Sequence, residues 1–352
     1  MDEPTFEFEA GWQSPSNIAL VKYWGKTANQ IPINPSLSMT LHSSVTRTSI
    51  RAVKKNKASR KVQLKYRFEG EENIAFQSKV LVLLNNLVDE FPFLNEYSLE
   101  IDSTNTFPHS AGIASSASSM SALALCLLSI QEKITGKKMN FHAFYKKASH
   151  IARLGSGSAS RSVYGNYVLW GKYIKVPKSG NLTAIPLPVK SHPLFSNLND
   201  SILVIDQAVK PVSSRAGHEK MGTHFFRKGR IEQVNEHLIV IIKAIMSGDW
   251  DSFSRVVENE AFTLHALMMS SDPGFTLMQP ATLKAIEKLA SFRSQYGVKI
   301  TFTLDAGPNL HLLYPDENKA NIQDFIKQEL APLCTNNYVI HDRIGSGPVQ
   351  IN

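Results

Sequence analysis

The chain of 352 residues is long enough for one large or two medium domains with a substantial core. Hydrophobic residues make up 43% of the sequence, as in ordinary globular proteins, and no apolar run is long enough to predict a membrane-spanning helix. The formal net charge of +8 is compatible with anionic partners, either nucleic acid or small molecules.

The N-terminal segment is acidic and lacks the basic and apolar regions of a secretory signal. The two cysteines, Cys126 and Cys334, give neither a disulfide framework nor a metal-binding spacing. Both features predict a protein of the reducing cytoplasm.

The sequence of the first half predicts several strands near its start and a mixture of strands and helices after them. The expected strands are Asn17–Trp24, Asn34–Leu41, Thr46–Val53, Val62–Phe68 and Tyr97–Ile101, of which the third and fourth form a hairpin. The expected helices are Ser78–Phe91, ended by Pro92, then Ser115–Lys133, which stops near Gly136, and a third from the N-cap Asn140 to Arg153. This order favours a mixed architecture.

A Pro- and Gly-rich segment, Pro177–Pro193, is the best candidate boundary, which gives domains of 1–190 and 191–352. The expected strands beyond it are Ser201–Asp206, Val298–Leu304, Leu310–Tyr314 and Tyr338–His341. The expected helices are Ser213–Arg227, Arg230–Gly248, Trp250–Met269, Gln279–Gln295 and Ala320–Leu330. Strands and helices in both halves predict an α+β or α/β fold of two domains.

The stretch Phe107–Leu123, FPHSAGIASSASSMSAL, is built from small residues and runs into an apolar helical pattern. Gly112 lets the backbone approach a ligand closely, and Ser115 and Ser116 stand where the helix begins. The first amides of a helix lack internal partners and attract anions. We expect this loop to hold nucleotide phosphates; the alternative is a loop that only caps a core helix.

Three charged residues are candidates for a reactive cleft. Asp305 ends an apolar strand and opens a turn, where it either serves as a base or only shapes the turn. Lys22 interrupts an apolar strand, so it either reaches the surface or faces a polar cleft. Arg161 follows a glycine–serine loop and could grip a carboxylate or phosphate with two hydrogen bonds. His265, on a helix, is expected to pack or cap, and no cluster has zinc spacing.

The densest basic run, Arg51–Arg67, alternates like a solvated hairpin and has little aromatic content. A solvated surface is therefore the favoured interpretation, and nucleic-acid binding is the alternative. The glycine pattern of Leu154–Gly171 matches neither the dinucleotide fingerprint nor a Walker loop, because Ser160 replaces the third glycine and Tyr173 replaces Ser or Thr.

Four segments in this order resemble the GHMP small-molecule kinase superfamily and, within it, the mevalonate diphosphate decarboxylases. They are NIALVKYWGK (Asn17–Lys26), FPHSAGIASSAS (Phe107–Ser118), GSGSASRS (Gly155–Ser162) and DAGPN (Asp305–Asn309). The resemblance implies an α+β fold with an ATP and substrate cleft between two domains. It also implies ATP-dependent decarboxylation of mevalonate 5-diphosphate to isopentenyl diphosphate, with ATP and Mg²⁺ as cofactors and a homodimeric assembly.

The resemblance assigns roles residue by residue. Asp305 matches the family's catalytic aspartate, Lys22 a lysine near the reacting groups, Arg161 the arginine that holds the substrate carboxylate, and Ser158 a serine beside it. The implied substrate-binding residues are Tyr23, Ser156, Ser213, Ser214 and Lys79. The implied nucleotide-binding residues are Ser110, Gly112, Ser115 and Ser116. The sequence identifies no protein ligand for Mg²⁺, which we expect ATP to hold.

One position departs from the family pattern. Members usually carry an arginine in the helix before the phosphate loop, where the predicted helix Ser78–Phe91 has only Lys79. Either Lys79 replaces that arginine or the substrate is a monophosphate. The alternatives within the superfamily are a phosphomevalonate decarboxylase and a mevalonate 3-kinase-like enzyme, which phosphorylates without decarboxylating. The alternative from another class is a basic nucleic-acid-binding protein, which would bind RNA with a steep dependence on salt.

Overall fold

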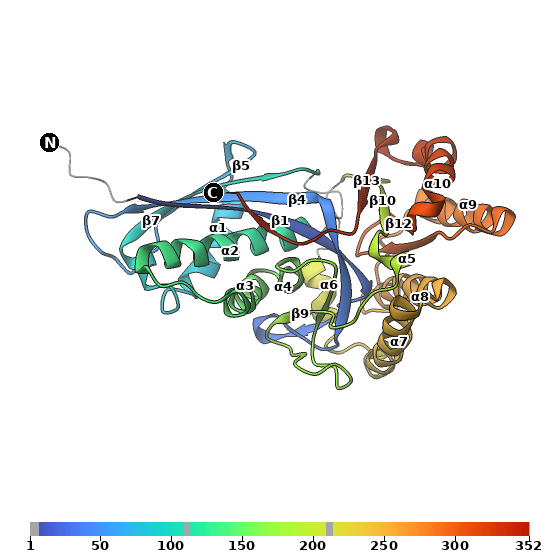
Figure 1. Cartoon of the computed structure of the whole chain (residues 1–352), viewed down its shortest axis with the longest axis horizontal. Helices are drawn as coiled ribbons and strands as arrows, with labels where there is room; N and C mark the ends of the chain where they lie inside the picture. The colour runs from blue at the N-terminus through green and yellow to red at the C-terminus, as the bar shows by residue number, and fades with distance from the viewer. Residues whose placement is uncertain (1–6, 109–112, 209–213, 352) are drawn as a thin grey trace.

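The computed structural model describes residues 7–108, 113–208 and 214–351, apart from the side chains of 214 and 215. A sheet of eight strands forms the first half (Figure 1). Its main path runs β14 (Val349–Gln350), β1 (Glu7–Val21), β4 (Ser36–Lys54), β7 (Tyr97–Asn105), β5 (Leu64–Phe68) and β6 (Glu71–Glu72). The strand β8 (Tyr167–Trp170) pairs with the start of β4 and with β9 (Ala184–Pro186). A separate small ladder joins β2 (Lys26–Thr27) to β3 (Ile31–Pro32).

The strand β4 is continuous where two strands were predicted. The carboxylate of Asp342, from the far end of the chain, accepts hydrogen bonds from the backbone N–H groups of His42, Ser43 and Ser44. These residues have no partner on β1 in the strand register. A carboxylate that satisfies three such donors lets the chain continue as one strand through an irregular stretch.

The predicted hairpin between 46–53 and 62–68 is wrong. The end of β4 pairs with β7 in antiparallel register, while β5 lies on the other side of β7 and runs parallel to it. The helix α1 (Ile74–Asn85) connects β5 to β7, so this segment is a strand–helix–strand unit. Parallel neighbours need such a crossover, which a hairpin interpretation overlooks.

Four helices cover one face of this sheet: α1, α2 (Ser115–Thr135), α3 (Phe141–Gly155) and the short α4 (Ala159–Ser162). The predicted start of α2 at Ser115 and its end at Gly136, which adopts a left-handed conformation with φ of 67°, are confirmed. The predicted N-cap of α3 is also confirmed, since the Asn140 side chain accepts from the backbone N–H of Ala143.

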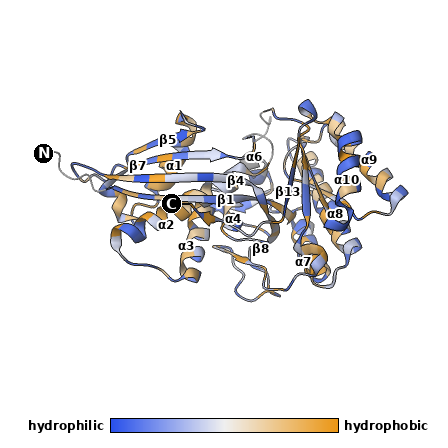
Figure 2. Cartoon of the chain, turned by 45° about the horizontal axis from the view of Figure 1, so that its top comes forward, coloured by the Kyte–Doolittle hydropathy of each residue, from blue (hydrophilic) through white to orange (hydrophobic). Residues whose placement is uncertain are grey.

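The helix α2 lies close to the sheet because its facing side chains are small. Its serines bond directly to the strands, with Ser121 Oγ 2.7 Å from Ser14 Oγ and Ser118 Oγ 2.6 Å from Thr46 Oγ1. Hydrophobic residues follow the same helix beneath the sheet (Figure 2). This packing fixes the N-terminus of α2 against β1 and β4.

The second half is built on a four-stranded antiparallel sheet in the order β11 (Thr301–Leu304), β12 (Leu310–Tyr314), β10 (Asn199–Leu203) and β13 (Val339–Arg343). Its helices are α5 (Pro193–Ser196), α6 (Ser214–Lys220), α7 (Arg227–Ser247), α8 (Trp250–Met269), α9 (Pro280–Tyr296) and α10 (Lys319–Phe325), which continues as a π turn. The prediction for α8 is confirmed, whereas the helix expected over 213–227 ends at Lys220.

The hydrophobic core joins the two halves. One cluster combines Ile18 and Leu37 of the first sheet with Ile202, Leu238 and other buried residues of the second half. Two further clusters lie within one half each, and they contain the two free cysteines, Cys126 and Cys334. The C-terminal strand β14 returns to pair with β1 (Figure 1). The boundary near residue 190 stays a prediction.

Candidate active site

A buried ion pair joins the two halves of the chain. Lys22 follows the end of β1, and Asp305 follows the end of β11. The Lys22 ammonium lies 3.0 Å from Asp305 Oδ1 and also donates to the carbonyl of Ala19 at 2.7 Å. The Lys22 side chain is 1% exposed, whereas the Asp305 side chain is 30% exposed. The alternative of a surface lysine is therefore wrong, and the carboxylate is the accessible member of the pair.

The surroundings set the ionisation of both groups. Burial lowers the pKa of Lys22, and the Asp305 and Glu260 carboxylates oppose that shift only in part. Burial favours the neutral form of Asp305, but Lys22, His311 and Arg161 together outweigh it and hold its pKa below the ordinary value. The Asp305 carboxylate is therefore ionised at neutral pH.

The guanidinium of Arg161 is fixed in plane by two side chains from the first sheet. Arg161 lies in α4, and its Nε donates to Asn17 Oδ1 at 3.2 Å while Nη1 donates to Ser36 Oγ at 2.6 Å. Its centre lies 5.8 Å from the Trp170 ring. Burial lowers the pKa of Arg161 to about 10, so it stays charged at neutral pH. Its charge adds to the lowering of the pKa of both Lys22 and Asp305.

Hydroxyl groups connect this site to the start of α2. Ser116 Oγ lies 3.2 Å from Ser156 Oγ, which lies 3.4 Å from Ser158 Oγ. Ser115 and Ser116 are the first residues of α2, a helix of 21 residues. Hydroxyl donors at a helix N-terminus suit phosphate oxygens, so this donor set fits a nucleotide phosphate group.

An aromatic wall closes one side of the site. The Tyr23 ring lies 4.7 Å from Trp170 and 4.3 Å from His218. The buried Tyr23 hydroxyl makes no hydrogen bond within the described residues, and burial raises its pKa. Burial, with Lys26 and Arg161 adding to it, lowers the pKa of His218 to about 3. His218 therefore stays neutral, and its Nδ1 accepts from the N–H of Gly25 at 2.9 Å.

Several predicted site residues are not brought into this group. Ser110, Gly112 and Ser213 lie outside the described residues, and Ser214 is described only as the first residue of α6. Lys79 lies exposed on α1 with its ammonium 5.5 Å from the Phe76 ring centre.

Sequence reasoning missed a polar network behind Lys22. The backbone N–H of Lys22 donates to Glu260 Oε2 at 2.7 Å, and Arg230 Nη2 donates to the Lys22 carbonyl at 3.1 Å. Asn17, in the quoted NIALVKYW segment, was not recognised as a partner of Arg161. His265, expected to pack or cap, lies with Nε2 3.1 Å from the Asp305 carbonyl oxygen. Of these contacts, only that of Asn17 with Arg161 had a signal in the sequence, because Asn17 is a polar residue at the start of an apolar strand.

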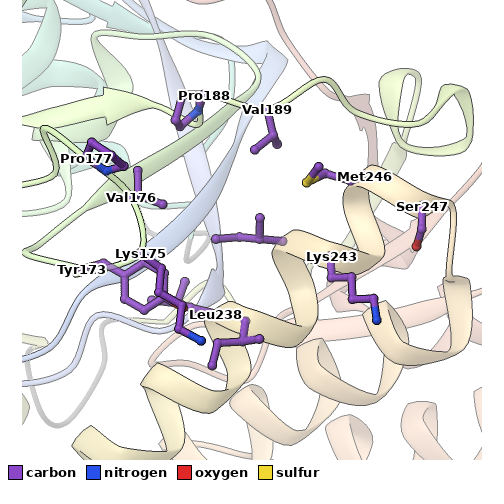
Figure 3. A pocket seen from close by; sticks show the side chains of 12 residues that line it. Tyr173, Lys175, Val176, Pro177, Pro188, Val189, Leu238, Lys243, Met246 and Ser247 are labelled. Carbon is purple, nitrogen blue, oxygen red and sulfur yellow. The ribbon is translucent and has the colours of Figure 1, made fainter.

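A cavity of about 570 Å³ lies elsewhere, between α7 and the segment 173–189 (Figure 3). Its walls are mainly apolar, with Val176, Leu238 and Met246 pointing inward and Lys175 and Lys243 among its lining residues. None of the predicted site residues lines it, so this cavity is distinct from the Lys22–Asp305 site.

Other features bear on the alternatives. In the basic run, Arg51 pairs with Glu100 at 2.6 Å and Arg67 with Asp102 at 2.6 Å, as expected of a solvated sheet surface. Within residues 7–108, 113–208 and 214–351, no group of three or more His, Cys, Asp or Glu could hold a metal ion. Every helix in that part of the chain is too short or too polar to traverse a lipid bilayer.

Comparisons with known proteins identify the family of the chain. Residues 14–179 match the diphosphomevalonate decarboxylase-like N-terminal domain, and residues 201–344 match the mevalonate 5-diphosphate decarboxylase C-terminal domain. The diphosphomevalonate decarboxylase of Saccharomyces cerevisiae is 30% identical over 91% of this chain and 81% of its own length.

Two solved structures share the whole architecture. The mevalonate diphosphate decarboxylase from Staphylococcus aureus is 28% identical with a TM-score of 0.83, covering 99% of each chain. A protein described as MDDEF in complex with MVAPP, AMPPCP and magnesium is 26% identical with a TM-score of 0.83, covering 99% of this chain and 100% of its own. The expected α+β fold is thereby confirmed, and the chain belongs to the mevalonate diphosphate decarboxylase family.

Proposed function

We propose that this chain catalyses the ATP-dependent decarboxylation of mevalonate 5-diphosphate to isopentenyl diphosphate, with ADP, phosphate and CO2 as the other products. The observation that carries this proposal is the Lys22–Asp305 pair at 3.0 Å with the Arg161 charge beside it. A carboxylate base, an ammonium and a guanidinium around one site suit a substrate that has a hydroxyl and a carboxylate on neighbouring carbons.

The ATP-binding residues proposed here are Ser115 and Ser116 at the start of α2, with Ser110 and Gly112 in the loop before it. The relative in complex with MVAPP, AMPPCP and magnesium supports binding of ATP with Mg²⁺. When bound, ATP supplies the phosphoryl group that makes the tertiary 3-hydroxyl a good leaving group, and Mg²⁺ offsets the charge of the phosphates.

Asp305 and Lys22 act on the 3-hydroxyl. Because the Asp305 carboxylate is ionised and 30% exposed, it can accept the hydroxyl proton. Lys22 holds the carboxylate from the buried side through Oδ1, so within the described residues Oδ2 remains for the substrate. The ammonium also offsets negative charge as the proton moves.

Arg161 holds the substrate carboxylate in line with the departing group. Asn17 and Ser36 engage Nε and Nη1, so within the described residues Nη2 remains for the substrate. Ser158 lies beside Arg161 in the same turn and completes the catalytic set. Tyr23 offers a buried hydroxyl without a described partner as a substrate contact.

The remaining proposed contacts lie on the phosphate side. Ser156, Ser213 and Ser214 would contact the substrate phosphates, and Lys79 would contact the terminal phosphate. We further propose a homodimer in the cytoplasm whose chain divides near residue 190. The two domain matches, which lie on either side of that residue, support the division.

The test is a comparison of substrates. Purified protein with ATP and Mg²⁺ is given mevalonate, its 5-phosphate and its 5-diphosphate in turn, while ADP and CO2 are followed together. Release of both from the 5-diphosphate alone is expected. Turnover of the 5-phosphate instead would contradict the assignment, and ADP without CO2 would indicate a 3-kinase.

A further inference from the structure

We propose that α8 is the element that sets Lys22 against Asp305, with Glu260 and His265 as its two positioning residues. The inference rests on the proposed function, because it explains how the reactive pair is held. Neither residue touches the substrate in this scheme; each acts through a backbone group of a catalytic residue.

Glu260 fixes the backbone on which Lys22 is carried. Its Oε2 accepts the Lys22 N–H at 2.7 Å, while Arg230, from α7, donates to the Lys22 carbonyl at 3.1 Å. Asn34 donates to the same carbonyl at 2.9 Å. The two peptide groups flanking the Lys22 Cα are therefore both held, and two of the partners come from helices of the second half.

The Glu260 carboxylate is itself immobilised. Arg230 donates to it twice, at 2.7 and 2.6 Å, and His237 Nδ1 lies 2.6 Å from Oε1. The side chain is fully buried, yet Arg230, His237 and the Lys22 N–H outweigh burial and lower its pKa to about 2. A bidentate pair with a third partner allows little movement.

About one and a half turns further along α8, His265 holds the backbone of Asp305. Its Nε2 lies 3.1 Å from the Asp305 carbonyl oxygen and donates to it. His265 and Glu260 are five residues apart, which is a rise of about 7.5 Å along a helix. A single rigid helix thus positions the backbones of both the ammonium and the carboxylate, which come from segments 283 residues apart in the chain.

The first experiment compares Glu260→Gln with Glu258→Gln. Glu258 lies on the same helix, pairs with Arg293 at 2.5 Å and accepts from Thr301, but contacts neither catalytic residue. We expect Glu260→Gln to lower kcat by about 10- to 100-fold with KM values nearly unchanged, as for a small misplacement of reacting groups. Glu258→Gln should lose stability without this loss of kcat.

A double-mutant cycle separates positioning from general damage. In a Lys22→Met background the ammonium that Glu260 positions is gone. Adding Glu260→Gln should then lower the residual kcat less than about 2-fold, because the two residues act through the same group. Equal losses in both backgrounds would overturn the proposal. If Glu260→Gln does not fold, His265→Leu and His265→Gln replace it: Leu should lower kcat, and Gln, which keeps a donor, should restore it.

A crystal structure of Glu260→Gln gives a readout independent of turnover. We expect the Lys22–Asp305 distance to lengthen from 3.0 Å to beyond hydrogen-bonding range. An unchanged distance would overturn the positioning role. If the wild-type protein released no CO2 from mevalonate 5-diphosphate, the proposed function would fail, and this distance would still decide the role of α8.

Discussion

Asp305 is kept ionised by fixed cations, which outweigh the effect of its burial. Lys22 is almost wholly buried beneath it, and Arg161 is held in plane by two neutral side chains. Because neither cation can withdraw into solvent, the carboxylate meets its substrate with its charge already arranged. The reactive behaviour of one residue therefore depends on the burial of its neighbours.

Replacing Asp305 with Asn should lower turnover by about a thousand-fold, since an amide cannot accept the hydroxyl proton. Affinity for an ATP analogue should be nearly unchanged, because the proposed phosphate contacts lie at the start of α2. Steady-state CO2 release and calorimetric titration measure the two quantities. Asp249→Asn is the matched control, since Asn also caps α8 well. Near-normal turnover in Asp305→Asn would contradict the assigned role.

Glu260 should make stability depend on pH. Its pKa is about 2 in the folded chain, below the ordinary value, so its stabilisation is present above about pH 4.5 and is lost as pH falls towards 2. That lowering corresponds to about 3 kcal/mol. Urea unfolding of wild type and Glu260→Gln should therefore differ fully at pH 7, and the difference should shrink below about pH 4.5 as pH falls towards 2. A gap that is constant with pH would refute the buried ion pair as its source.

The turn after α4 is closed by the C-terminal segment of the chain. The backbone N–H of Asn166 donates to the Gly345 carbonyl at 2.8 Å, and the N–H of Gly345 donates to Thr40 at 2.8 Å. The segment 345–347 thus lies between β4 and the turn that follows Arg161. Close backbone approach requires glycine here, since a Cβ on Gly165 would lie 2.1 Å from the Ser346 carbonyl oxygen.

Gly165→Ala should therefore destabilise the protein by about 2 to 3 kcal/mol, because backbone rather than a flexible side chain must move. Gly180→Ala is the matched control, because nothing lies within 4 Å of its added Cβ. Thermal unfolding compares the two variants. Equal midpoints would show that the C-terminal segment is not tightly packed against this turn.

Local signals explain which elements were predictable. The C-terminus of α2 was predictable because Gly136 readily adopts the left-handed conformation that ends a helix. The N-terminus of α3 was predictable because the Asn140 side chain accepts a hydrogen bond from the first turn. The continuity of β4 depends on Asp342, nearly 300 residues away, so no local pattern reveals it. Glu260 and Arg230 look like ordinary helix-surface charges in the sequence. Lys22, Arg161 and Asp305 could be named, and expected to meet in one site, because their segments resemble a known family. The partners that hold them, Asn17 and Ser36 on Arg161 and Glu260 on Lys22, could not.

The two halves of the protein share one hydrophobic core. The cluster that contains Ile18 and Leu37 also contains Val204, Leu238 and Leu313, so separating the halves would expose it to water. Figure 1 shows the last strand lying back beside the first. The Lys22–Asp305 site, whose residues come from both halves, therefore lies in a molecule whose halves are packed against each other through one core.

We accordingly expect the chain to unfold in urea as one cooperative unit, with fluorescence and circular dichroism giving the same midpoint. The fragment 1–190 alone should lack the near-ultraviolet dichroism of packed aromatic rings, because its share of the common core is unpaired. Two separate transitions, or a natively packed fragment, would show instead that each half is an independent folding unit.

The two thiols supply an intrinsic measure of how this molecule opens. Burial raises the pKa of both Cys126 and Cys334, the second to about 11, so neither forms the reactive thiolate readily in the native state. They lie in separate hydrophobic clusters, one in each half. A thiol reagent will therefore label each only when its own cluster opens, and the two labelling rates will report the opening of the two halves without any engineered probe.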